Sequence, residues 1–192
     1  MHLYSYVVQH DFGFAPNPFG GYLTLATCKP DIRLHAKPKD YLIGTGSAKV
    51  GNNRLIYAAQ VSNVITIEEY GSNSKFANKR PAIQGQWWRR HGDNIYVKIN
   101  GKWTQRRNCH HVAKDQGGDL RGMNVLICKR FSYFGDSKTE IPTEFAEVIK
   151  KGPNCKKIDV QGIPDFIAWM AKLPQGRIGK PVLCHGPSLM CN

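Results

Sequence analysis

Short runs rich in β-branched and aromatic residues, separated by turn residues, dominate the first two thirds of the chain. Such runs are typical of strands. We therefore predict strands at residues 3–8, 22–27, 40–46, 54–67, 95–99, 102–105 and 123–130. In the long run 54–67, the alternation of apolar positions changes between Val61 and Val64, which predicts a bulge or bend there. Asn100-Gly101, between two of the runs, is a strong signal for a tight hairpin.

The last third of the chain changes to helical spacing. Phe145, Val148 and Ile149 recur at helical intervals and lysines follow them, so a helix is predicted over 142–151. A second helix is predicted over 164–173, where one proline stands in the first turn and another follows the end.

Strands that close around turns and are followed by helices indicate the α+β class. We expect a small, partly open mixed β-barrel with the two C-terminal helices packed on it. Residues 1–174 are expected to form a single nucleic-acid- or nucleotide-binding domain, and residues 175–192 an extended C-terminal tail.

The chain of 192 residues carries 27 Lys and Arg against 14 Asp and Glu, a net charge of +13. This excess favours a polyanionic partner, and we expect nucleic acid, DNA rather than RNA, or a nucleotide. No stretch approaches the roughly 18 apolar residues that span a bilayer, and the first residues lack signal-peptide features, so a cytoplasmic protein without membrane contact is expected. The dispersed cysteines are expected to be free thiols: Cys28, Cys109, Cys128, Cys155, Cys184 and Cys191.

Residues 75–107 hold nine Lys and Arg side chains and one acid, a local charge of +8. Aromatic side chains are interleaved with these cations, and together such groups can follow a phosphate backbone and stack unpaired bases. The candidates for phosphate contact are Arg89, Arg90, Arg106 and Arg107, and those for stacking are Phe14, Phe19, Trp87 and Trp88. The alternative is that the rings belong to the core beside a solvated basic face.

Residues 10–21 gather polar and rigid residues directly after a predicted strand. Loops of this kind position functional groups on a scaffold. His10 is a candidate general base with Asp11 as its orienting carboxylate, although adjacent strand residues point to opposite faces. The alternative is a purely structural loop.

A second candidate group follows the strand predicted at 22–27. Cys28 and Lys29 place a thiol beside an ammonium, and a nearby cation favours the thiolate. A buried, inert thiol is nevertheless the more common fate, and we favour it over a nucleophile. The turn Gly44–Ser47 offers hydroxyls and exposed backbone to a phosphate or base, although it lacks the length and the lysine of a P-loop.

Cys109, His110 and His111 form a third polar group. They are consecutive and lack the ligand spacing of ordinary zinc sites, so neither a metal nor a cofactor is predicted. His110 and His111 instead join the candidate acid–base residues. The residues assigned to nucleotide or base binding are Asn17, Thr27, Cys28, Lys29, Gly46, Ser47, Asp93 and Asn94.

The strings DFGFAPNPFGGYLTLATCKPDIR, YLIGTGS, RLIYAAQVSNVITIEEY and GDNIY, together with the HH pair, resemble the nucleotide modification associated domain 2 family. The resemblance implies a role in base or nucleotide modification in phage or bacteria, with the polar motif positions named above as the site. The strand pattern also resembles the barrels of the PUA and EVE-like superfamily, which read modified bases extruded from the strand.

Two functions remain open at this point. The first is a module that captures a modified or flipped base in a pocket beside the basic face. The second is an enzyme that acts on a nucleotide or DNA base with His and Asp side chains as acid and base. In either case, we expect the site residues to converge on one concave pocket.

Overall fold

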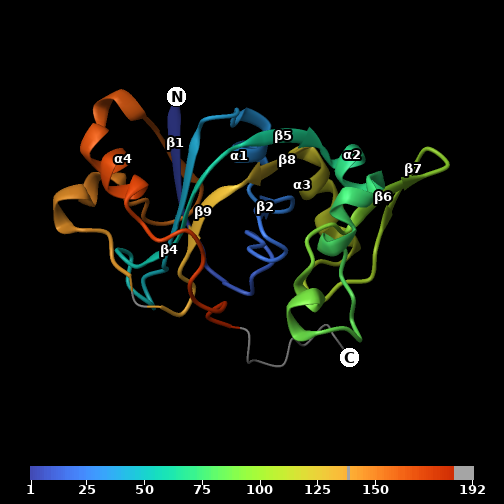
Figure 1. Ribbon diagram of the computed structural model, residues 1–192. Helices are drawn as coiled ribbons and strands as arrows, with labels where there is room; N and C mark the ends of the chain where they lie inside the picture. The colour runs from blue at the N-terminus through green and yellow to red at the C-terminus, as the bar shows by residue number, and fades with distance from the viewer. Residues whose placement is uncertain (138, 184–192) are drawn as a thin grey trace.

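The computed structural model describes residues 1–137 and 139–183, and within them the strands form three sheets. The strands are β1 (His2–Val7), β2 (Leu23–Leu25), β3 (Tyr41–Thr45), β4 (Leu55–Gln60), β5 (Asn63–Thr66), β6 (Tyr96–Ile99), β7 (Lys102–Gln105), β8 (Asn124–Cys128), β9 (Arg130–Tyr133), β10 (Cys155–Asp159) and β11 (Gly176–Arg177). A six-stranded sheet has the order β10-β1-β3-β4-β9-β11, a second sheet the order β2-β8-β5, and β6-β7 form a projecting hairpin (Figure 1).

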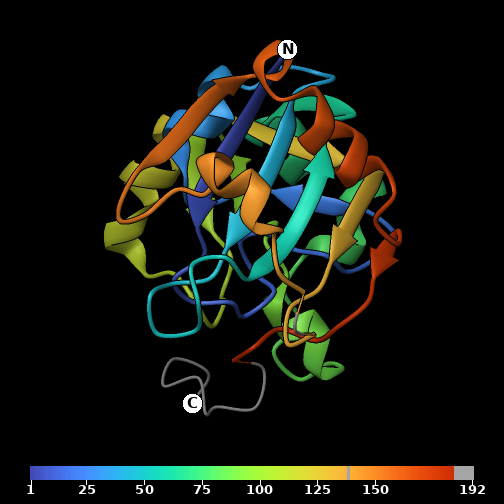
Figure 2. The same cartoon turned by 90° about the vertical axis from the view of Figure 1, so that its left-hand side faces the viewer.

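The helices are short. They are α1 (Pro30–His35), α2 (Ile67–Ser72), α3 (Gln116–Arg121) and α4 (Pro164–Ala171), with 3-10 helices η1 (Ser74–Lys79), η2 (Trp87–His91), η3 (Ala113–Asp115), η4 (Thr143–Val148) and η5 (Val160–Gly162). Figure 2 shows the six-stranded sheet with the orange and red C-terminal elements across its outer face. The mixed α+β class is confirmed, and no closed barrel is found in the described residues.

The chain passes between the two larger sheets at two bends. The strand predicted over 54–67 is divided into β4 and β5, so the predicted bend is confirmed. The strand predicted over 123–130 is divided likewise into β8 and the beginning of β9. The two bends are hydrogen-bonded to each other. The amide of Ser62 donates to the carbonyl of Ile127 at 2.8 Å, and the hydroxyl of Ser62 accepts from the amide of Lys129 at 2.9 Å.

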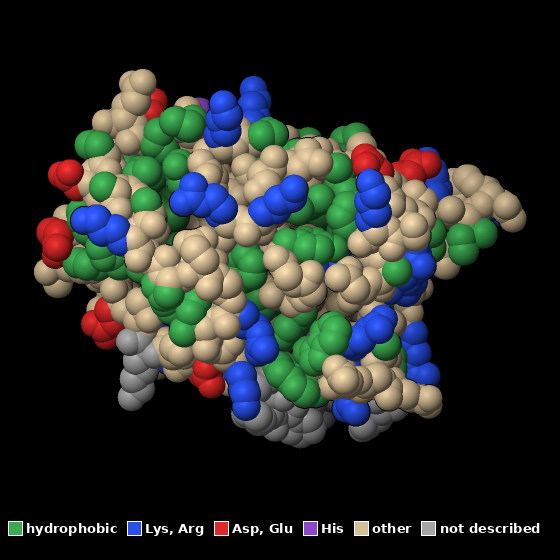
Figure 3. Space-filling view, in the orientation of Figure 1, with side chains coloured by type: hydrophobic (Ala, Val, Ile, Leu, Met, Phe, Trp, Pro, Cys, Tyr) green, Lys and Arg blue, Asp and Glu red, His purple; other side chains and the backbone are tan. Residues whose placement is uncertain are grey.

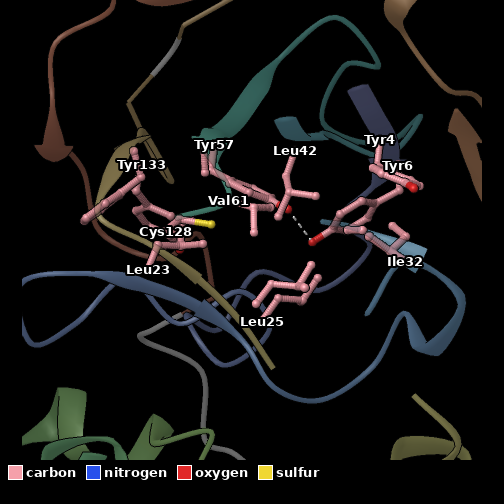
Figure 4. Close-up of a cluster of buried hydrophobic side chains, with 14 of the residues drawn as sticks. Tyr4, Tyr6, Leu23, Leu25, Ile32, Leu42, Tyr57, Val61, Cys128 and Tyr133 are labelled. Carbon is pink, nitrogen blue, oxygen red and sulfur yellow. Dashed lines mark hydrogen bonds between the residues drawn. The ribbon is translucent and has the colours of Figure 1, made fainter. Parts of the chain in front are cut away.

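Both faces of the six-stranded sheet are buried. Along β1, Tyr4 and Tyr6 enter a core shared with β2 and β8, whereas Leu3 packs with Phe166 of α4 on the opposite face, as the alternation of strand side chains requires. In the first core, the hydroxyl of Tyr57 donates to that of Tyr6 at 2.8 Å (Figure 4). Double burial explains the near-continuous hydrophobic runs of β3 and β4.

Of the two helix predictions, the one for residues 142–151 is wrong. Residues 142–151 form only the 3-10 helix η4, which is interrupted at Phe145, where φ is −109°. The amide of Phe145 bonds back to Pro142 and that of Ile149 to Ala146, so each turn closes after three residues and packs its apolar side chains on the sheet instead of extending. The helix predicted at 164–173 is confirmed as α4.

The described part of the predicted C-terminal tail, residues 175–183, packs on the rest of the fold. β11 pairs in parallel with β9, and residues 184–192 of the predicted tail lie outside the described residues. Cys28, Cys128 and Cys155 are free thiols as predicted. The prediction is wrong for Cys109, which is disulfide-bonded. Those for Cys184 and Cys191 fall outside the described residues.

Candidate functional site

The backbone at Cys28 has an unusual conformation. Cys28 and Lys29 have φ angles of 56° and 38°, so two successive non-glycine residues occupy the left-handed region. Such conformations are costly and concentrate at functional sites. The turn follows β2 and leads into α1, which begins at Pro30. It leaves the Cys28 side chain half-buried, lining a cavity of about 700 Å³.

His111 stands between this thiol and a buried carboxylate. Its Nε2 lies 3.5 Å from the Sγ of Cys28, and its Nδ1 lies 2.6 Å from the Oδ2 of Asp119. A carboxylate at Nδ1 holds a proton on that nitrogen, which leaves Nε2 able to accept the thiol proton. The three side chains therefore have the order of nucleophile, base and orienting carboxylate.

Asp119 is itself fixed by neighbouring donors. Its Oδ1 accepts the backbone amide of Cys28 at 2.7 Å, and its Oδ2 accepts the hydroxyl of Tyr96 at 2.9 Å. The fully buried Arg33 donates to the carbonyls of Cys28 at 2.7 Å and Asp119 at 2.5 Å. These bonds join the turn after β2 to α3, so the geometry of the site is built into the fold.

The His111–Asp119 pair is ionised at neutral pH. Burial alone lowers the pKa of His111, but the hydrogen bond to Asp119 and the contact with Cys28 outweigh it and raise the pKa to about 10. For Asp119, burial raises the pKa, and the contact with His111 together with the other donors reverses this effect and lowers it. An imidazolium beside the sulfur stabilises a thiolate.

The same three side chains also meet the distance requirement for a metal site, because their ligand atoms lie within 4.8 Å of one another. The arrangement favours a proton relay instead. Cys28 faces Nε2 and Asp119 faces Nδ1, and an imidazole binds a metal through one nitrogen, so one ion cannot take all three as ligands.

The cavity in front of Cys28 is cationic. It is lined by Tyr6, Val7, Val8, Gln9, His10, Ala15, Cys28, Lys29, Ser47, Ala48, Asn52, Lys151, Gly152, Pro153 and Asn154, and none of these described residues is Asp or Glu. The ammonium of Lys29 lies 4.8 Å from the centre of the Tyr6 ring, and burial lowers its pKa. The structure therefore brings together four predicted site residues: His10, Cys28, Lys29 and Ser47.

Asp11 lies away from this cavity. Its Oδ1 accepts the hydroxyl of Tyr133 at 2.5 Å and the amide of Gly13 at 3.3 Å, and its Oδ2 accepts the amide of Val182 at 3.1 Å. Burial raises the pKa of Asp11, and these bonds offset only part of the effect. Asp11 thus joins its loop to the C-terminal segment, and its carboxylate is not available to orient His10.

Five of the predicted binding residues are buried inside the fold: Asn17, Thr27, Gly46, Asp93 and Asn94. Asp93 accepts hydrogen bonds from the hydroxyls of Thr24 at 2.6 Å and Tyr70 at 2.7 Å. The buried ammonium of Lys79 donates to Oδ1 of Asn17 at 2.8 Å. Asn17, Asp93 and Asn94 are hydrogen-bonded within the protein, whereas the buried hydroxyl of Thr27 has no partner among the described residues. The single shared pocket expected from the sequence is not formed.

His110 belongs to a different pair. Its Nε2 lies 2.9 Å from Nδ1 of His91, and its ring stacks on Phe14 with 4.4 Å between centroids. Burial and the neighbouring histidines lower the pKa of His110 to about 3, and burial with Arg90 lowers that of His91 to about 4. Both rings are therefore neutral at pH 7, and only His111 of the HH pair takes part in the relay.

The four arginines predicted to contact phosphate do not share one environment. Arg106 is used by the fold, because it donates to Oδ1 of Asn94 and to the carbonyl of Gly71, each at 3.0 Å. Of the other three arginines, Arg89 is partly exposed, and Arg90 and Arg107 are exposed. The ring of Phe19 lies 5.5 Å from that of Trp87 and 6.0 Å from that of Trp88, so three of the four predicted stacking residues gather in one place.

Sequence reasoning missed Asp119 and Arg33. Neither lies in a predicted element, since α1 and α3 have only six residues each. The available signal was weak: a cysteine directly after a strand, and an acidic residue eight positions after a histidine.

The fold and this site define an α+β protein with a cysteine, histidine and aspartate in relay order at the mouth of a basic cavity. The family model of the nucleotide modification associated domain 2 matches residues 1–186, and the chain belongs to that family. No curated protein and no solved structure matches the chain. Among residues 1–137 and 139–183, no helix has the length and hydrophobicity needed to cross a bilayer.

Proposed function

We propose that this protein is a thiol-dependent enzyme of nucleotide modification, in which Cys28 attacks a group attached to a nucleotide or nucleobase. The observation that carries the proposal is the ordered contact of Cys28 with His111 and of His111 with Asp119. Membership of the nucleotide modification associated domain 2 family supports the class of substrate. The similarity to PUA and EVE-like barrels stays a prediction and contributes nothing to this chemistry.

The arrangement suits acyl transfer. Cys28 reacts as the thiolate of an ion pair with the His111 imidazolium, in which the thiol proton already rests on Nε2, and Sγ bonds to the carbonyl carbon of an amide or ester. The carbon–nitrogen or carbon–oxygen bond then breaks, and the leaving group takes the proton from Nε2. Water or an amine next attacks the thioester, releases its proton to His111, and the sulfur leaves as the thiol. The cycle is redox-neutral and needs no oxidant or reductant.

The cavity supports an anionic substrate. Lys29 and Lys151 line it together with the amides of Gln9 and Asn52, without a carboxylate among the described lining residues. A phosphate or carboxylate in this space would be attracted by both ammonium groups. We expect the phosphate of a nucleotide to lie against these lysines while its acyl group reaches Cys28.

The first test compares the three described free cysteines. With iodoacetamide at pH 7 and peptide mass spectrometry, Cys28 should react about tenfold or more faster than the half-buried Cys155, because the imidazolium favours its thiolate. His111→Gln should slow the reaction of Cys28 at least tenfold. Cys155→Ser is the matched control and should leave the rate at Cys28 unchanged.

The second test addresses the chemistry. The protein is incubated with base-acylated nucleotides, quenched in acid, and examined by mass spectrometry for acyl-Cys28, which hydroxylamine should remove. Turnover that survives in Cys28→Ala, or equal alkylation of Cys28 in the native protein and in His111→Gln, would show that the relay does not operate.

A further inference from the structure

A second concave site lies where the loop before β2 meets β9 and β11. This hollow has a volume of about 580 Å³ and is lined by Pro18, Phe19, Gly20, Gly21, Trp88, Lys129, Phe131, Gln175, Gly176 and Arg177. Three of these residues are aromatic and two are cationic, and none of the described lining residues is acidic. Their combination of ring faces and positive charge differs from the lining of the Cys28 cavity.

Two of the three aromatic rings of the hollow are fixed by burial. Phe19 and Phe131 are only 6% and 5% exposed and form its floor. Trp88 is partly exposed, and its indole nitrogen donates to the side chain of Gln86 at 2.6 Å. The guanidinium of Arg177 lies 5.6 Å from the centre of the Phe19 ring. Binding of a planar ligand would therefore carry little entropic cost for ordering these rings.

Positive charge surrounds this hollow. On the face shown in Figure 3, Lys and Arg side chains border a hydrophobic patch in the lower half of the view. Lys129 and Arg177 belong to the lining, and the guanidinium of Arg89 lies 5.9 Å from the centre of the Trp88 ring.

We propose that this hollow, which we call the Trp88 hollow, binds single-stranded nucleic acid. An unpaired base stacks on Trp88 above the Phe19 and Phe131 floor, and Arg177 and Lys129 contact the phosphates on either side. A duplex keeps its bases paired and cannot offer a free ring face to this site. The loop that contributes Phe19 also contributes Ala15 to the Cys28 cavity. A bound strand and the thiol cavity would therefore both contact this loop.

The test measures binding of a fluorescein-labelled 12-nucleotide oligodeoxythymidylate by anisotropy, with a 12-base-pair duplex as comparison. Cys28→Ala protein is used throughout, so that binding is judged without thiol chemistry and a failed enzyme proposal leaves this result intact. Trp88→Ala should weaken single-strand binding roughly 5- to 150-fold. Arg177→Ala should weaken it and lower the slope of log affinity against log salt by about 0.7.

Matched controls lie on other parts of the surface. Trp103→Ala, in the β6-β7 hairpin, and Arg121→Ala, in α3, should leave affinity within about twofold, and circular dichroism checks that every variant is folded. Unchanged affinity in folded Trp88→Ala would overturn the assignment of the hollow. Tighter binding of the duplex than of the single strand, or absence of binding at low salt, would overturn the proposed ligand.

Discussion

The substitution Asp119→Asn gives the sharpest test of the charge state of the site. Asparagine keeps the shape of the side chain, whose present exposure is 4%, but it removes the charge that faces His111. The pKa of His111 is about 10 in the folded chain, against about 6.5 for an exposed histidine. At about 1.36 kcal/mol for each pKa unit, this difference contributes about 4 kcal/mol to folding at pH 7.

The sign of the pH dependence follows from the direction of the two shifts. Because the folded pKa of His111 is raised, its contribution is fully present below about pH 6.5 and is lost as the pH rises toward 10. Because the folded pKa of Asp119 is lowered, its contribution is present above its ordinary value of 3.8 and is lost as the pH falls through the lower folded value. The pair therefore stabilises the fold most in mildly acidic to neutral solution.

Urea unfolding of the native protein and of Asp119→Asn, at several pH values from 5 to 10, measures this contribution. We expect a gap of about 3 to 4 kcal/mol near pH 6 that narrows steadily toward pH 10. Asp31→Asn is the control, because Asp31 is exposed and pairs with the exposed Arg121 at 3.2 Å, so its gap should be small at every pH. A gap for Asp119→Asn that stays constant from pH 6 to pH 9.5 would mean that His111 is neutral in the folded chain.

Two further substitutions test how the fold supports the site. Gly122→Ala would place a methyl group 2.5 Å from the guanidinium carbon of Arg33, so we expect a loss of about 1 to 3 kcal/mol of unfolding free energy and slower alkylation of Cys28; an unchanged alkylation rate would argue against a positioning role for Arg33. Lys79→Met would leave acceptors on Asn17 and Tyr22 without their buried donor, so urea unfolding should show a loss of about 3 kcal/mol, and a loss below about 0.5 kcal/mol would contradict this.

Local signals carried much of the fold and failed where tertiary packing decided the outcome. The alternation that changed between Val61 and Val64 located the bend between β4 and β5, where the chain leaves the six-stranded sheet and enters the three-stranded one. The segment 142–151 had helical spacing, yet packing of its apolar side chains on the sheet favoured two short turns over a continuous helix. β10 was missed because its sequence, CKKID, is mostly exposed and has little hydrophobic pattern.

The candidate site was less predictable because its members come from separate short elements. Cys28 and His111 were both visible in the sequence as candidates, but their contact depends on Asp119 and Arg33, which lie in or beside helices of six residues. The polar residues of the loop 10–21 have a structural role. Asp11 and Asn17 are buried and hydrogen-bonded to the protein itself, so a motif rich in polar side chains reflected the internal support of a loop as well as a binding surface.

The two proposed sites are physically different and make separable demands on a ligand. The Cys28 cavity offers a nucleophile and two lysines, which suits one small anionic group, whereas the Trp88 hollow offers ring faces and a guanidinium, which suits an unpaired base in a strand. The loop holding Ala15 and Phe19 borders both, and Asp11 anchors that loop to the C-terminal segment through Val182. A strand bound at the hollow would therefore contact the same loop that lines the thiol cavity.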